Sequence, residues 1–522
     1  MARTHARLGL ALLVAPLVLL LLGVGLLAHQ PAAAPRLAAL WPLRTAQPAR
    51  HSGAAVHTFT LASSHVHELG GRRSASFNAS AAPLAALAAL PQRPEPLTLR
   101  SYRADITRPR NARAHTAARL AAAAHVPELE WETLSMPHPN ISDRHTLRTL
   151  ARMAEIAYYA PNDTSLPHGG WVPDAGWNIS QSFGWADDGM RGHVFIDPKA
   201  DPHGKDIVVL AIKGTSASVL PGGGDTAKRD KVNDNLLFSC CCAHVGWTWR
   251  SVCDCFGSSD PPPSHTTDVP EPTDGPWGAS AARKRAQVAW GADPKAPTCS
   301  KPCLSTALVQ KSLYYPAATD LFNNVSYAFP DADIWITGHS LGGAIASLLG
   351  HTFGVPVVTF EAPAERMAAQ RLHLPMLSKH ASSEHITNVY HSGDPIPMGE
   401  CVGAASWCAT AGFAMESRCH TGRTVLYDTT RLLGWSSNIL THRIANLIDD
   451  LFATDWDELV RGRQKDKNPP PILDDELEKL KAVPKTISEK KCTDCTGWKF
   501  TDDEPDSMRP SRTRLGLHED DF

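Results

Sequence analysis

The strongest constraint on the fold is the run Gly338-His339-Ser340-Leu341-Gly342. The apolar residues just before it, 334–337, predict a short strand, and residues 344–349 predict a helix. A serine between two glycines at such a strand-to-helix turn takes a strained conformation that lifts its hydroxyl above the sheet edge. We therefore predict that Ser340 is a nucleophile. The amide of Leu341, at the start of the helix, is predicted to stabilise a developing oxyanion.

Strand-like and helix-like segments alternate on both sides of this turn. Residues 192–197 and 206–213 predict two strands, and the second is nearly continuous apolar, as in a strand covered on both faces. Two more strands are predicted at 355–360 and 385–390, with a helix between them. Such alternation produces right-handed crossovers and a mostly parallel sheet. The predicted fold class is α/β, of the α/β-hydrolase type, with the catalytic domain over residues 131–460.

In this fold the acid and the base follow the serine, in the chain order Ser, Asp, His. Asp394 is the candidate acid because it leaves the strand at 385–390 at its carboxyl end, where ligand sites of parallel sheets gather. Asp428 is the alternative. His442 is the candidate base, because the amphipathic helix predicted at 444–452 would hold it against the domain.

Other histidines are less suitable as the base. His518 lies in an acidic tail, and His420 adjoins Cys419, so we expect it to belong to a disulfide loop. His339 is the neighbour of the nucleophile and is expected to point elsewhere.

A second oxyanion donor is expected from a loop after an earlier strand. Thr215 follows the strand at 206–213 and is predicted to supply its backbone N–H, with its hydroxyl as an additional donor. A simple polar turn is the alternative for residues 214–216.

The twelve cysteines favour an oxidising compartment, because they are even in number and cluster in loop-like sequence. Their pairing cannot be read from the sequence. Cys253 and Cys255 with Cys299 and Cys303 leave a four-thiolate zinc site open as an alternative, although we expect no metal and no cofactor. The run at 231–243, which ends in three cysteines, is expected to be a lid edge, an acyl-facing wall or a disulfide anchor.

The N-terminus predicts a membrane anchor. Residues 8–28 are apolar over about the 20 residues that a membrane-spanning helix needs. Arg3 and Arg7 precede this span, which predicts a cytoplasmic segment 1–7 and a lumenal remainder. A cleaved signal peptide, cut near residues 32–34, is the alternative.

The sequons agree with a lumenal location, and the net charge argues against an electrostatic partner. The net charge is −2, which gives no global field for binding nucleic acid. Protein partners stay unknown. Five sequons for N-glycosylation are present, at Asn78, Asn140, Asn162, Asn178 and Asn324.

Three segments are expected to lie largely outside the packed core. Residues 29–130, rich in Ala, Pro, Arg and His, predict a lumenal stem of low complexity, packed in part on the catalytic domain, with one helix at 114–124. Residues 257–296 are rich in Pro, Ser and Thr and predict an exposed insertion within the domain. Residues 461–522 are polar and predict a largely disordered tail, apart from a short helix near 474–480.

Several of these motifs resemble a known family. The runs around the nucleophile, the oxyanion loop and the acid resemble the fungal class 3 lipases: residues 336–344, 213–216 and 392–397. Four further runs resemble, more narrowly, the fungal autophagy-related vacuolar lipases: residues 234–243, 359–365, 371–375 and 492–495. The resemblance covers roughly residues 130–500 and the N-terminal anchor.

This resemblance implies a serine lipase that uses Ser340, Asp394 and His442 to hydrolyse phospholipids and triacylglycerols. It also implies a type II single-pass membrane glycoprotein that passes from the endoplasmic reticulum and Golgi through multivesicular bodies to the vacuole lumen. There it would break down autophagic bodies, with membrane lipids as substrate. The chain departs from the family in its Pro-rich insertion. Another lumenal serine hydrolase, such as an esterase or peptidase, and a catalytically silent membrane adaptor are the alternatives.

Overall fold

The computed structural model describes residues 55–67, 74–78, 97–123, 125–159, 190–197, 205–215, 227–243, 251–255, 298–309, 313–376, 385–401, 406, 408, 411–463 and 472–502. All of these belong to one unit that spans His51–Phe522. The predicted anchor at 8–28, the insertion at 257–296, His518 and the sequons at Asn162 and Asn178 lie outside the described residues. Within the described part, no helix is both long and apolar enough to span a bilayer.

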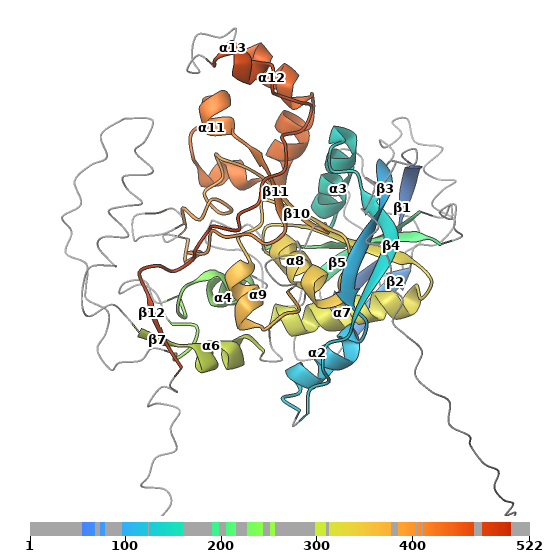
Figure 1. The fold of residues 1–522 in the computed structure, drawn as a ribbon, viewed down its shortest axis with the longest axis vertical. Helices are drawn as coiled ribbons and strands as arrows, with labels where there is room; N and C mark the ends of the chain where they lie inside the picture. The colour runs from blue at the N-terminus through green and yellow to red at the C-terminus, as the bar shows by residue number, and fades with distance from the viewer. Residues whose placement is uncertain are drawn as a thin grey trace, which may run out of the picture. The chain divides into compact units, whose positions relative to one another are not determined.

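A ten-stranded mixed sheet forms the centre of the unit (Figure 1). Along the sheet the order is β11 (Arg423–Tyr427), β10 (Ile386–His391), β9 (Val357–Phe360), β8 (Asp333–His339), β6 (Ile207–Ile212), β5 (Met190–Asp197), β1 (Ala55–His67), β3 (Leu97–Pro109) and β4 (Trp131–Pro139), with β2 (Ser74–Asn78) paired to β1. Strands β6, β8, β9, β10 and β11 run parallel. The parallel α/β-hydrolase sheet predicted from the sequence is thus found from β6 to β11, and the strands from β5 to β4 pair antiparallel.

Helices cover both faces of the parallel half, because alternate residues of its strands enter two different cores. In β6, Val208, Leu210 and Ile212 pack into the core of α7 (Tyr314–Ala328) and α8 (Leu341–Phe353). Val209 and Ala211 pack into the opposite core, with α3 (Arg144–Ile156) and η4 (Asn446–Leu451). The continuous apolar sequence of β6 predicted this burial on two faces.

A side-chain cap sets the start of α3. Asp143 is its N-cap, and one carboxylate oxygen accepts hydrogen bonds from the Thr146 backbone N–H at 2.9 Å and from the Thr146 hydroxyl at 2.7 Å. Such a cap satisfies backbone donors that have no partner inside the helix.

The part of the predicted stem that the structure describes is not of low complexity, and it packs on the rest of the domain. β1 lies in the main sheet between β5 and β3, and α2 (Ala112–Leu120) follows β3. Leu97, Leu99 and Ile106 of β3 are buried. β3 mixes buried apolar residues with exposed polar ones such as Arg100 and Asp105, and that pattern is easily mistaken for low complexity. The helix predicted at 114–124 is α2.

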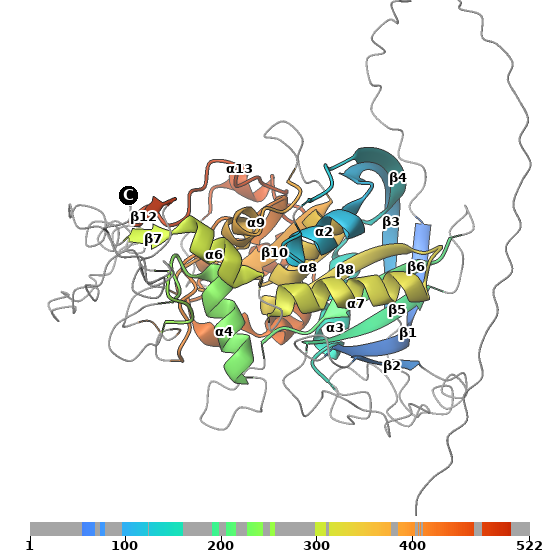
Figure 2. The ribbon, with the colours of Figure 1, turned by 90° about the horizontal axis from the view of Figure 1, so that it is seen from below.

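The short helix expected near 474–480 is α13 (Asp474–Leu477), but the rest of the predicted disordered tail needs correction. After α12 (Trp456–Arg463) and α13, the chain forms β12 (Lys499–Thr501), which pairs with β7 (Thr298–Ser300). Figures 1 and 2 both show β12 beside β7, and in Figure 1 the red segment runs back from α13 to reach it. Long-range disulfides hold this polar segment, so it needs little apolar surface to stay in place.

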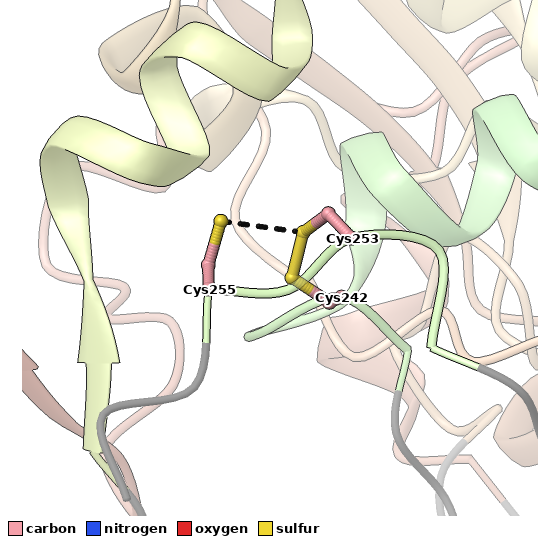
Figure 3. Close-up of side chains that lie close together, drawn as sticks. All are labelled: Cys242, Cys253 and Cys255. Atoms are coloured by element: carbon pink, nitrogen blue, oxygen red, sulfur yellow. Dashed lines mark hydrogen bonds between the residues drawn. A yellow bond between two sulfur atoms is a disulfide. The ribbon is translucent and has the colours of Figure 1, made fainter. Parts of the chain in front are cut away.

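Six disulfides join all twelve cysteines: 240–495, 241–299, 242–253, 255–303, 401–408 and 419–492. The three consecutive cysteines that follow α4 (Ala227–Phe238) are therefore a disulfide anchor. Figure 3 shows Cys253 bonded to Cys242, with the Cys255 sulfur 3.4 Å away. Zinc binds thiolates, and these sulfurs are in disulfides, so the four-thiolate alternative is wrong.

Candidate active site

Ser340 lies at the turn between β8 and α8 with a backbone φ of 56° and ψ of −134°. A non-glycine residue seldom takes this positive φ, and such strain is typical of functional turns. Its amide donates to the Phe360 carbonyl at 3.0 Å, which holds the turn on β9. A Cβ on Gly342 would lie 2.3 Å from the Ile212 carbonyl oxygen, so only glycine lets α8 begin so close to β6.

The structure brings Ser340, His442 and Asp394 into one line. His442 Nε2 lies 2.9 Å from the Ser340 hydroxyl oxygen, and His442 Nδ1 lies 2.6 Å from Asp394 Oδ2. The geometry places the ring proton on Nδ1, facing the carboxylate, and leaves Nε2 to accept the serine proton. A base oriented in this way can activate a hydroxyl nucleophile.

Asp394 is fully buried in the loop after β10. Its Oδ1 accepts the Ile396 backbone N–H at 3.0 Å, which orients the carboxylate. Burial alone would raise the pKa of Asp394, but the charge of His442 and hydrogen bonding to it bring the pKa below its ordinary value. The carboxylate is thus ionised where it faces the base.

The loop that carries His442 is tied to the loop that carries Asp394. His442 ends η3 (Ile439–His442), which Asn438 caps by accepting the Leu440 N–H at 2.9 Å. The Asn438 backbone N–H and the Thr441 hydroxyl both donate to the Gly393 carbonyl oxygen, at 3.1 and 2.7 Å. These hydrogen bonds join the loop of the base to the loop of the acid.

The oxyanion loop lies next to the serine. A Cβ on Gly214 would come within 3.2 Å of the Ser340 Cβ, so the end of β6 touches the elbow. Thr215 follows, and its hydroxyl donates to Asp234 Oδ2 of α4 at 2.8 Å. Burial raises the pKa of Asp234 well above its ordinary value. Leu341 is the first residue of α8, so its amide has no acceptor inside the helix.

Two contacts at the site were missed by sequence reasoning. His339 does not point away: its Nε2 lies 2.9 Å from the His442 carbonyl oxygen, and its Nδ1 lies 2.8 Å from the Tyr158 hydroxyl. Burial, and then the neighbouring His442, lower the pKa of His339 to about 3, so its ring is neutral. Its position directly before the nucleophile was the only signal in the sequence.

The alternative residues lie elsewhere. Asp428 caps α11 (Thr429–Leu432) and pairs with Arg431 at 2.8 Å. His420, beside its disulfide as predicted, lies 3.2 Å from Glu489. Of the described sequons, Asn324 is exposed on α7, Asn140 is half-buried, and Asn78 ends β2.

Comparison with known proteins agrees with this geometry. The family model "Lipase (class 3)" matches residues 304–401, which include Ser340 and Asp394. In sequence, the chain is 43% identical over 445 residues to "Putative lipase ATG15" of Mycosarcoma maydis, covering 78% of this chain and 76% of the relative. It is 40% identical to the protein of the same name from Cryptococcus neoformans, covering 72% and 71%.

Solved structures of lower similarity include Lip2 lipase from Yarrowia lipolytica, at 16% identity and a TM-score of 0.23, covering 53% of this chain and 76% of that one. Lipase II from Rhizopus niveus is 17% identical with a TM-score of 0.22, covering 54% and 79%. TM-scores this low carry no weight beside the sequence relationship. Identity of 38–43% with fungal relatives over most of the chain shows that the protein belongs to the family of the putative lipase ATG15.

Proposed function

We propose that the protein is a serine lipase that hydrolyses acyl esters of phospholipids and triacylglycerols. The observation that carries the proposal is the alignment of Ser340, His442 and Asp394 at 2.9 and 2.6 Å. The matching lipase family supports lipid esters as the substrate class.

In the proposed reaction, Ser340 Oγ attacks the acyl carbonyl carbon while His442 Nε2 takes the hydroxyl proton. The amides of Leu341 and Thr215 donate to the oxyanion that forms. The intermediate then collapses, and His442 returns the proton to the departing alcohol oxygen. Water, deprotonated by His442, cleaves the acyl-enzyme and releases the fatty acid.

We further propose that the enzyme works in the lumen of the secretory pathway and the vacuole, on membranes delivered there for degradation. Twelve paired cysteines suit an oxidising lumen. The apolar run at 8–28 supports retention as a type II membrane protein, and the sequons support glycosylation.

The test is fatty-acid release by the full-length protein from vesicles of phosphatidylcholine and phosphatidylserine, with and without triacylglycerol. Ser340→Ala is expected to lower the rate by at least about 10³-fold, because the acyl-enzyme cannot form. Ser305→Ala, a change on α6 (Lys301–Leu308), is the matched control and is expected to keep full activity.

Three results would contradict the proposal. Unchanged lipid hydrolysis by Ser340→Ala would exclude the nucleophile. Hydrolysis of soluble short esters or peptides, but not of vesicles, would indicate another serine hydrolase. A folded wild-type protein that hydrolyses none of these would indicate the silent adaptor.

A further inference from the structure

Glu361 is a buried carboxyl group to which the reaction above gives no role. It directly follows β9, is fully buried, and has a φ of 47°, which a glutamate rarely takes. Its Oε1 accepts the His391 backbone N–H at 3.2 Å. Within the described residues, Oε2 has no hydrogen-bond partner. A buried polar atom of this kind is costly unless a nearby group uses it.

No cation faces Glu361 within the described part of the chain. The nearest candidate is His391, whose Nε2 lies 3.7 Å from Glu361 Oε1. However, His391 Nδ1 accepts the Gly393 N–H at 3.1 Å, and Nε2 lies 3.1 Å from the Thr441 carbonyl oxygen. Both ring nitrogens are thus engaged as in a neutral imidazole with its proton on Nε2. Burial lowers the pKa of His391, which agrees with the neutral form.

Glu361 and Asp394 are both fully buried and both contact the backbone of His391. Glu361 Oε1 accepts the His391 N–H, and the Asp394 N–H donates to the His391 carbonyl oxygen at 3.1 Å. Asp394 is thus the charged neighbour of Glu361. Burial, followed by repulsion from Asp394, raises the pKa of Glu361 well above its ordinary value. Hydrogen bonding from Glu361 is in turn among the effects that lower the pKa of Asp394, after the larger effect of His442. Two carboxyl groups that share a buried site cannot both ionise, so one keeps its proton. Asp394 faces the base, so Glu361 is the neutral partner.

We propose that Glu361 is a protonated positioning residue whose carboxylic acid donates a hydrogen bond to Asp394 and keeps that carboxylate ionised and directed at His442. The inference rests on the proposed function of Asp394 as the acid. Glu361 is then the fourth group in a hydrogen-bonded chain that runs from Ser340 through His442 and Asp394. A donor to the charged form keeps Asp394 ionised at lower pH, so the base stays oriented in acidic surroundings.

The test compares three substitutions of Glu361 in the full-length protein. Glu361→Gln keeps a donor for Asp394 and an acceptor for the His391 amide, so it is expected to retain kcat within about 3-fold. Glu361→Leu removes both groups. Glu361→Gly also removes them but relieves the positive φ, so a loss of activity there does not come from backbone strain. Glu458→Gln, an exposed change on α12, is the control.

The Glu361→Leu and Glu361→Gly variants are expected to lower kcat by about 10- to 100-fold with KM nearly unchanged. A misdirected base affects the transition state more than it affects substrate binding. They should also move the acid limb of the kcat–pH profile to higher pH. Equal loss of kcat in the folded Gln, Leu and Gly variants would overturn the proposal. So would an unchanged pH profile in Leu and Gly.

A second readout does not depend on lipid hydrolysis. The infrared difference spectrum between the wild-type protein and Glu361→Gln at neutral pH should contain the carbonyl band of a neutral carboxylic acid. The same band is expected in a Ser340→Ala background. A carboxylate band in its place would overturn the inference even if the enzyme proves to be a lipase. Its presence in a protein without lipase activity would leave the protonation of Glu361 standing and the proposed function wrong.

Discussion

At the scale of residues, the candidate base is held from several sides. Asp394 binds the His442 ring, and His339 lies 2.9 Å from the His442 carbonyl oxygen. His339 stays neutral down to a pH of about 3, because burial lowers its pKa that far. It therefore fixes the backbone of the base without placing a second positive charge beside it.

Substitutions can show which of the two carboxylates predicted from the sequence, Asp394 or Asp428, is the catalytic acid. Asp394→Asn is expected to lower kcat by about 10³- to 10⁴-fold, because an amide stabilises the wrong tautomer of His442. Asp428→Asn should stay within about 3-fold of wild type, since Asp428 caps a short helix and pairs with the exposed Arg431. The measurement is steady-state hydrolysis of a lipid ester, with both variants checked for native disulfides. Equal losses in the two variants would contradict this assignment.

At the scale of elements, the C-terminal strap, residues 481–502, is fastened across the domain. Disulfides join Cys492 to Cys419 and Cys495 to Cys240. Arg366 donates to the carbonyl oxygens of Glu489 and Cys492 at 3.0 and 3.3 Å. The strap has few buried apolar residues, and it is held instead by disulfides and by hydrogen bonds from the charged Arg366 side chain.

The pair of buried His420 and half-buried Glu489 makes the attachment of the strap depend on pH. Contact with Glu489 raises the pKa of His420 above 6.5 despite burial. For Glu489, burial acts upward, but hydrogen bonding and the charge of His420 lower the pKa from 4.5 to about 2. The stability that His420 contributes is fully present below pH 6.5 and is lost as the pH rises through its raised pKa. The stability that Glu489 contributes is fully present above pH 4.5 and is lost as the pH falls towards 2.

His420→Gln is therefore expected to destabilise the protein most between pH 4.5 and 6.5, by about 1.5–3 kcal/mol, because Glu489 loses its charged partner while the Tyr390 and Thr424 hydroxyls still donate to it. Urea unfolding at a series of pH values measures this, with the exposed His145→Gln as control. A loss of stability that does not vary with pH would show that the pair is not charged.

At the scale of the whole molecule, the sheet depends on the N-terminal strands. β1 pairs with β5 on one side and β3 on the other, so removing it opens an edge in the middle of the sheet. The strands β3 and β4, which follow it in the sheet, would lose their attachment at the same time.

A chain that begins at residue 51 is expected to fold with its six disulfides, whereas one that begins at residue 131 is expected to aggregate. The longer chain keeps the whole unit His51–Phe522, and the shorter one loses β1, β2 and β3. Size-exclusion chromatography and protease resistance distinguish the two. If residues 8–28 span a membrane, the full-length chain should also sediment with membranes while the chain from residue 51 does not. A folded, active chain from residue 131 would restore the stem hypothesis.

The sequence by itself determined the elements whose signals are local. The elbow at Ser340, the apolar run of β6 and the order Ser340, Asp394, His442 all follow from short patterns. A buried parallel strand and a strand-to-helix turn each require particular residues within a few positions. For this reason the α/β-hydrolase core could be predicted in detail.

Only the tertiary structure decided the contacts between distant segments. Cys240 pairs with Cys495 across 255 residues, and nothing local to either cysteine selects its partner. β1 joins β3 to β5 in the sheet, and the mixed sequences of β1 and β3 gain a role only through that pairing. The roles of Glu361 and His339 likewise depend on contacts with groups on other loops. Local patterns set the conformation of each segment, whereas pairing and burial depend on which surfaces the completed fold brings together.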